Sequence, residues 1–412
     1  MADSLWVDRK KEVNGAGLHA LIIGVSDYEF LPGTDEFPKP GVVTLGLTKV
    51  NIPATGAFRV AQWLKSSYWH PTTQIKSIRL LLSPSKKEIT PGEDPPKSED
   101  DLRRAALAQA TNSVPRANTA NVEQAMLDWK ADCQGDKDGI ALLYVSGHGI
   151  QWGSKDDSIV LLDDFSKNEQ FLNQAIDINK TRKGMMGSVM PQVQLYFVDA
   201  CQIQPDEYKK FEEAGSPLGL TSTFGESETS STPIYFGACG QTAAKGRSGP
   251  GTYFAEALVA CLEGSALQGP NSQSSLPVAK AYWHAPVLGL LEPLQNAVSE
   301  IAAREKEKQD IVLGGRTRPA VFCASATTPV VTLLFDVDPD DAAKAAFAEL
   351  WDWTGNTQVR KRMPCWERPL KVSSLPAGIY QLKVFASEPY KPESPIRVEA
   401  RPPVWKQGIT VP

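Results

Sequence analysis

Short apolar runs alternate with segments of helical periodicity over the first three quarters of the chain. The predicted strands are residues 19–25, 75–82, 140–145, 194–198 and 234–237. The predicted helices are residues 55–66, 122–129, 253–262 and 287–308. Because such alternation is typical of βαβ units, we expect an α/β fold with a mainly parallel sheet flanked by helices. The strands 19–25 and 140–145 are almost wholly apolar, as expected of central parallel strands.

The pattern changes near residues 324–329. Beyond that point, residues 330–337, 370–372 and 379–385 are predicted strands, and Tyr380, Leu382 and Val384 alternate with polar positions. This alternation predicts half-buried antiparallel strands and a small all-β sandwich of the immunoglobulin or transthyretin type. We therefore expect an N-terminal extension at 1–16, an α/β domain at 17–325 and a C-terminal β-sandwich domain at 326–412.

Three segments rich in Pro, Gly, Ser and charge are predicted loops, at residues 83–101, 202–232 and 264–275. The second is longer than most connections within a compact domain. It is therefore predicted to be a functional or mobile loop.

Composition excludes several classes of protein. The chain has 412 residues, 22% of them charged, and a net charge of −5, which argues against wholesale binding of nucleic acid. The first 17 residues lack an apolar signal region, and no run approaches the roughly 18 apolar residues that cross a bilayer. We therefore expect a cytoplasmic protein without membrane contact.

Neither a metal nor another cofactor is expected. The six cysteines are widely spread without a CxxC pair, so we predict buried thiols rather than zinc ligands or disulfides. His19, His70 and His284 have no metal-binding partner at useful spacing. The sequence holds no GxxxxGK[ST] motif, and the glycine-rich residues 246–251 match neither a Walker loop nor a dinucleotide fingerprint.

Two motifs follow neighbouring apolar strands: ALLYVSGHG at 141–149 and QLYFVDAC at 194–201. Because ligands bind beyond the carboxyl ends of parallel strands, His148 and Cys201 are expected to share one site. An imidazole can take the proton of a thiol and later protonate a leaving amine. The N–H groups of Gly149 and Cys201 are candidates for an oxyanion hole.

These motifs resemble those of the caspase-like peptidases, the superfamily of caspases, metacaspases and paracaspases. The resemblance covers about residues 17–325 and extends to the first strand at 21–25, a strand at 233–239 and a helix at 253–258. Cys201 lies 53 positions after His148, close to the caspase spacing of about 50. The resemblance implies a cysteine endopeptidase of bacterial type, with His148 as general base and acid and Cys201 as nucleophile.

Each motif also has a structural interpretation. A lone SGHG can be a turn at a strand end, and a lone cysteine after an apolar run is usually a buried thiol. Cys239 also follows a strand but has no accompanying histidine, so it is expected in the core or a pocket wall. A catalytically silent caspase-like scaffold is therefore the alternative to an enzyme.

Asp199 is the candidate for substrate binding, because in extended backbone its side chain faces the same side as Cys201. The resemblance implies cleavage after Arg or Lys, since metacaspases and paracaspases carry Asp at this position. Alternatively, Asp199 caps the following turn. Those relatives have a second acid at a position that falls near Thr55–Gly56 here, where none is present.

Basic pairs predict possible processing sites. Lys209–Lys210 follow the nucleophile, and Arg182–Lys183 precede its strand. We hypothesise a zymogen cut at one of them in a regulatory or defence cascade; a merely solvated charged loop is the alternative. Protein or peptide substrates are expected, and the C-terminal domain is a candidate site for an activating or inhibitory protein.

Overall fold

A computed structural model describes residues 3–33, 41–92, 96–151, 158–202, 214–221, 234–238, 244–315, 317–365, 369–390, 395–400, 402 and 404–410. The chain divides into two compact units. The first comprises residues 1–259 and 287–322, and the second comprises residues 260–286 and 323–412. The second unit thus contains the predicted sandwich residues together with 260–286; the domain boundaries expected at 16/17 and 325/326 stay predictions.

Within the described residues, the first unit is built on a seven-stranded sheet in the order β1-β3-β2-β4-β8-β9-β13. The strands are β1 (Leu5–Asp8), β2 (Gly17–Val25), β3 (Gln74–Ser83), β4 (Ile140–Gly147), β8 (Val193–Ala200), β9 (Ile234–Gly237) and β13 (Val312–Gly314). The five inner strands are parallel, and the edge strands β1 and β13 are antiparallel to their neighbours. The predicted α/β fold with a mainly parallel sheet is confirmed.

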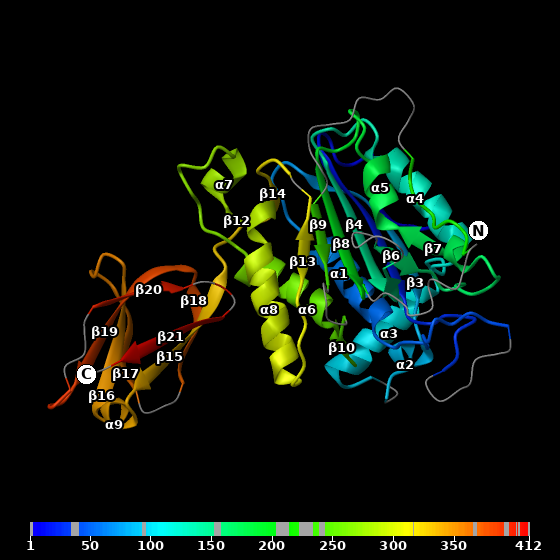
Figure 1. Cartoon of the computed structure of the whole chain (residues 1–412). Helices are drawn as coiled ribbons and strands as arrows, with labels where there is room; N and C mark the ends of the chain where they lie inside the picture. Colours follow the sequence, from blue (N-terminus) through cyan, green and yellow to red (C-terminus); the bar gives the residue numbers. More distant parts are fainter. Residues whose placement is uncertain are drawn as a thin grey trace. The chain divides into compact units, whose positions relative to one another are not determined.

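Helices cover both faces of this sheet (Figure 1). On one side lie α1 (Pro53–Ser67), α6 (Tyr253–Ala260) and α8 (Leu291–Arg304), and on the other lie α4 (Thr119–Cys133) and α5 (Ile178–Gly184). All nine residues of β2 are buried, which explains why its sequence is apolar without alternation.

The start of α1 is held by residues at the carboxyl edge of the parallel sheet. Pro53 begins the helix, and its N-cap Ile52 has no polar side chain to accept from the first N–H groups. Other elements satisfy them instead: Ser26, after β2, accepts from Ala54 N–H at 2.9 Å, and the Glu88 carboxylate accepts from Thr55 N–H at 2.9 Å. The helix is therefore fixed to the ends of β2 and β3.

Three predicted boundaries differ from the structure. The predicted loop 83–101 contains α2 (Lys86–Ile89) and the start of α3 (Glu99–Thr111), an acid-rich helix whose N-cap Ser98 accepts from the N–H of Asp101. The predicted helix 287–308 begins with a 3₁₀ turn (Val287–Gly289) and ends at Arg304. The predicted helix 253–262 is α-helical to Ala260 and continues as a π-turn at Cys261–Ser265.

The second unit contains the predicted β-sandwich. One sheet has the order β18-β15-β21 and the other the order β17-β16-β19-β20. Their strands are β15 (Val330–Asp338), β16 (Ala346–Asp352), β17 (Gln358–Pro364), β18 (Leu370–Pro376), β19 (Gly378–Ala386), β20 (Ile396–Ala400) and β21 (Val404–Thr410). Tyr380, Leu382 and Val384 are buried in a core shared by both sheets, as their alternation predicted. Residues 260–286 add α7 (Pro277–Ala281) and β12 (Trp283–Pro286).

Across the described ranges, none of the helices combines the length and the apolar composition needed to cross a lipid bilayer.

Candidate active site

The register of β4 and β8 brings the two predicted motifs together. Gly147 pairs with Ala200, so His148 and Cys201 are the next residues on adjacent parallel strands. Gly149 lies directly against Cys201, because a Cβ at position 149 would collide with the carbonyl oxygen of Cys201. Only glycine permits this approach. Three of the predicted site residues thus lie at one edge of the sheet.

Two residues that follow β2 hold His148. The N–H of His148 donates to the hydroxyl of Tyr28 at 2.6 Å, and the two rings lie 5.0 Å apart between centroids. Its Nε2 lies 2.6 Å from the carbonyl oxygen of Thr48. A carbonyl oxygen only accepts, so Nε2 carries the proton in the neutral ring and Nδ1 is left as the base. Burial lowers the pKa of His148, which favours this neutral form.

Cys201 differs from the other described cysteines. Cys133, Cys261, Cys323 and Cys365 are buried, and burial raises the pKa of each thiol. Cys201 is partly accessible, and its Sγ accepts a hydrogen bond from the N–H of Ala244 at 3.2 Å. An N–H donor stabilises the thiolate, which is the reactive form.

The N–H of Gly149 is not used in the pairing of β5 with β6. Gly149 begins β5 (Gly149–Ile150), which pairs antiparallel with β6 (Ile159–Leu161). Leu161 N–H donates to the carbonyl of His148, so Gly149 occupies the next, non-hydrogen-bonded position of the ladder. Its N–H therefore points away from β6, where an oxyanion can accept from it.

Asp199 lies one step deeper, within β8. It is buried, and its Oδ2 accepts from the hydroxyls of Tyr144 at 2.6 Å, Ser146 at 3.3 Å and Thr252. Its other oxygen, Oδ1, is buried without a hydrogen-bond partner in the described part of the chain. Burial raises the pKa of Asp199 to about 6, against the lowering effect of the three hydroxyls.

A second carboxylate occurs where the sequence comparison found none. Glu88, from α2, accepts from both the N–H and the hydroxyl of Thr55, and from the N–H of Ser85 at 2.8 Å. Burial raises its pKa. Glu88 is 33 residues from Thr55 in sequence, so only the fold reveals this placement.

Sequence reasoning missed Tyr28, Thr48, Ala244 and Thr252 as parts of the site. Thr48 and Ala244 contact the site through main-chain groups, and the residue type gives no indication of such contacts. Tyr28 had a usable signal, because it lies just beyond the carboxyl end of β2, where parallel sheets place functional groups.

The remaining histidines have structural partners. His19 lies between Ser77 and Asp136, with ring nitrogens 2.9 and 3.1 Å from their oxygens. His70 Nδ1 accepts from Thr73 N–H at 2.9 Å, and His284 Nδ1 lies 3.0 Å from the carbonyl of Tyr282.

Of the two predicted processing sites, one lies in a helix and the other lies outside the described residues. Arg182–Lys183 lie in α5, and the Arg182 guanidinium stacks over the Tyr235 ring at 5.6 Å from its centroid. The predicted loop is described only at 202 and 214–221, so Lys209–Lys210 lie outside the described residues, as does Cys239.

Comparison with known proteins adds a family assignment. A sequence model of the family described as "Caspase domain" matches residues 100–331, more than half of the chain. Among solved structures, one titled "structure of pro-sf-caspase-1" is similar, with 11% identity and a TM-score of 0.36. The alignment covers 76% of this chain and 92% of that chain. No curated protein matches the chain.

Proposed function

The chain belongs to the caspase-domain family, and from that premise we propose that it is a cysteine endopeptidase with His148 and Cys201 as its catalytic dyad. The observation that carries the proposal is the strand register, which makes these residues neighbours on β4 and β8. The bond from His148 Nε2 to Thr48 supports it, because that bond leaves Nδ1 as the base.

The proposed mechanism follows from these contacts. Nδ1 of His148 takes the thiol proton as Cys201 Sγ attacks the scissile carbonyl, and it then returns that proton to the leaving amine. Water, activated by the same nitrogen, hydrolyses the resulting thioester. The N–H groups of Gly149 and Cys201 bind the oxyanion, each contributing roughly 3–4 kcal/mol to transition-state stabilisation.

A basic residue before the scissile bond (P1) is part of the proposal. Asp199 is buried, and its Oδ1 has no hydrogen-bond partner among the described residues. At pH 7 or above its carboxyl is mostly ionised because its pKa is about 6. A buried carboxylate without a cation is costly, and the side chain of a substrate Arg or Lys supplies one.

Self-processing of a zymogen in a regulatory or defence cascade extends the proposal. We propose Lys209–Lys210 as the self-processing site, because cleavage at Arg182–Lys183 requires unfolding of α5. The sandwich of the second unit is proposed to bind an activating or inhibitory protein. Bacterial type and cytoplasmic location are proposed with it, the latter because the described cysteines are thiols rather than disulfides, which favours a reducing compartment.

A peptide library varied at P1 tests this function. We expect cleavage after Arg and Lys by the wild type, no cleavage by Cys201→Ala, and reduced preference for Arg and Lys with Asp199→Asn. Cleavage by Cys201→Ala equal to wild type contradicts the dyad. Mass spectrometry of the purified wild type and Cys201→Ala tests self-processing, which requires fragments in the wild type alone.

A further inference from the structure

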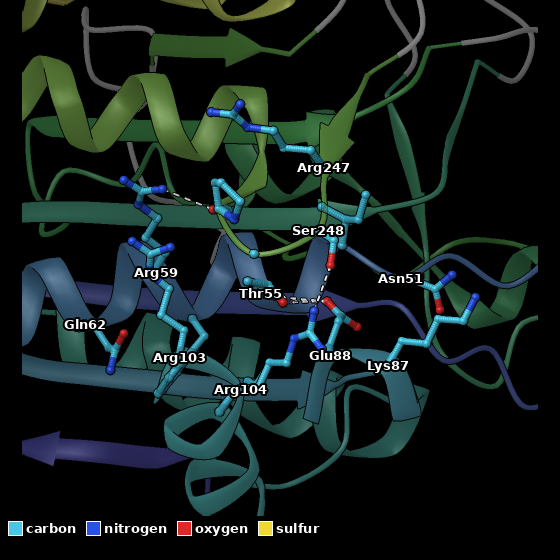
Figure 2. A pocket seen from close by; sticks show the side chains of 15 residues that line it. Asn51, Thr55, Arg59, Gln62, Lys87, Glu88, Arg103, Arg104, Arg247 and Ser248 are labelled. Atoms are coloured by element: carbon cyan, nitrogen blue, oxygen red, sulfur yellow. Dashed lines mark hydrogen bonds between the residues drawn. The ribbon is translucent and has the colours of Figure 1, made fainter. Parts of the chain in front are cut away.

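A surface pocket lies in the first unit between α1, the α2–α3 segment and a short hairpin. The hairpin pairs β10 (Gly246–Arg247) with β11 (Gly251–Thr252), and residues 248–250 form its tip. Figure 2 shows arginines of α1 and α3 on the helical side of the pocket and the hairpin tip opposite them.

The described lining of this pocket carries five cationic side chains and one carboxylate. The cations are Arg59, Lys87, Arg103, Arg104 and Arg247, and the carboxylate is Glu88. Arg103 forms ion pairs with Glu99 and Asp100, and Arg247 forms ion pairs with Glu256 and Glu305.

The carboxylate of Glu88, which lines the pocket, is engaged by main-chain groups. Both of its carboxylate oxygens accept from main-chain N–H groups, those of Thr55 and Ser85. These bonds bind the carboxylate to the start of α1. Because acids already offset the charges of Arg103 and Arg247, the positive charge that a ligand can meet comes chiefly from Lys87 and Arg104.

Lys87 and Arg104 are the cations available to a ligand. Lys87 is exposed, and no hydrogen bond or ion pair involves it within the described ranges. Arg104 donates to the carbonyl of Thr90 at 3.2 Å and to the hydroxyl of Ser248 at 3.1 Å, which leaves three of its five N–H donors. The pKa of Asp101 is lowered chiefly by its hydrogen bonds from Gly92 and Ser98 and, to a smaller extent, by the nearby charge of Arg104.

We propose that this pocket binds a small anion with several negative charges, of the polyphosphate class, at the hairpin tip. Guanidinium groups match the geometry of phosphate oxygens, and a lysine adds a compact point charge. Arg59 adds a third cation and donates to the carbonyl of Pro250 at 3.1 Å (Figure 2). The helical cations thus already hold the tip that the anion would contact.

The hairpin connects this pocket to the candidate active site. Just before β10, the Ala244 N–H donates to Cys201 Sγ, and in β11 the Thr252 hydroxyl donates to Asp199. Gly249, at the tip, packs against α3, since a Cβ there would collide with the carboxylate of Asp100. An anion that joins Lys87 and Arg104 to the tip restrains the hairpin, and with it the N–H donor of Cys201.

Titration calorimetry of the full chain with sodium tripolyphosphate, at constant ionic strength, tests the site. We expect one site per chain, with Kd raised about a hundredfold in Lys87→Ala/Arg104→Ala, about tenfold for each cation removed, and raised more than tenfold in Lys87→Glu, which also adds a negative charge. The matched control is Lys183→Ala/Arg304→Ala, which removes one exposed lysine and one exposed arginine of the same unit, on α5 and α8. Lys87 makes no hydrogen bond or ion pair with the described residues, so Lys87→Glu should fold normally. It therefore still tests the site if Arg104→Ala unfolds the protein.

The second readout is the rate at which iodoacetamide alkylates Cys201, which does not depend on peptidase activity. Tripolyphosphate is expected to change this rate at least about twofold in the wild type and not in Lys87→Glu. Four results overturn the proposal: no binding, equal weakening by the control pair, tighter binding of a hexaglutamate peptide, or binding with unchanged alkylation. The third would assign the pocket to an acidic protein segment.

Discussion

The carboxyl edge of the parallel sheet and the sandwich of the second unit place their polar residues in different ways. In the sheet, β2 is buried along its whole length. Polar residues lie at the strand ends: Ser26 follows β2 and Ser83 is the last residue of β3, and both are fully buried and hydrogen-bonded. In the sandwich, β15 and β19 alternate between buried and exposed positions. A strand covered on both faces can present reactive groups only beyond its end, whereas a strand buried on one face spreads polar groups over the other. The comparison predicts chemistry at the edge and structural support in the sandwich.

The largest effect is expected from a cysteine exchanged in each region. Cys201→Ala should lower kcat/KM by at least about 10⁴-fold, because no other group replaces the nucleophile, while the melting temperature stays unchanged. Cys365→Ala, in the core of the sandwich, should lower the melting temperature and leave kcat/KM near wild type. Loss of cleavage in Cys365→Ala, with the fold intact, would break the comparison.

A buried leucine in the sandwich tests the same division through stability. Leu382→Ala should reduce the free energy of unfolding of the sandwich by about 2–5 kcal/mol, since it leaves a cavity in the shared core. Cleavage at a temperature below the unfolding transition should persist. Leu143→Ala, in the buried part of β4, the strand that His148 follows, is the matched change in the other region and should reduce both stability and kcat. Denaturant unfolding and kinetics measure both.

The pH dependence of Asp199 sharpens the comparison within the edge. Its folded pKa of about 6 exceeds the ordinary value of 3.8, so the native state binds the proton more tightly than the unfolded state. Stability should therefore fall as pH rises from about 4 to about 6 and stay lowered above that. Asp199→Asn should remove this step in melting curves recorded against pH. It should also reduce kcat/KM for Arg substrates by tens of fold while sparing alkylation of Cys201.

The smallest effect is expected from one hydroxyl at the edge. Tyr28→Phe keeps the ring beside His148 but removes the acceptor of its N–H, which should lower kcat by about tenfold. KM should change little, and the pH at half-maximal kcat should shift, because Tyr28 positions the base. The matched control is Tyr380→Phe in the sandwich, whose hydroxyl donates to the carbonyl of Pro376. A tenfold drop in that variant would mean that hydroxyl loss acts through general stability.

The sequence predicted those parts of the molecule that depend on local pattern. β2 and β4 were recognisable because complete burial needs continuous apolar runs, and β19 because Tyr380, Leu382 and Val384 alternate. Helix α3 was missed because its first turn is acidic and its apolar face is small.

The contacts around His148 and Cys201 could not be predicted, for a different reason. Thr48 contacts His148 through a carbonyl and Ala244 contacts Cys201 through an N–H, groups found in nearly every residue. Glu88 reaches Thr55 only because α2 folds against the start of α1. Such contacts depend on tertiary packing, which leaves no signal in spacing or composition.

Active-site labelling tests the central claim most directly. The protein is treated with a peptidyl-arginine chloromethylketone, and intact mass and peptide mapping locate the adduct in wild type, His148→Ala and Cys201→Ala. We predict a single adduct on Cys201 in the wild type, at least about a hundredfold slower labelling in His148→Ala, and none in Cys201→Ala. Equal labelling of several cysteines, or labelling of Cys201 at the same rate without His148, would contradict the dyad.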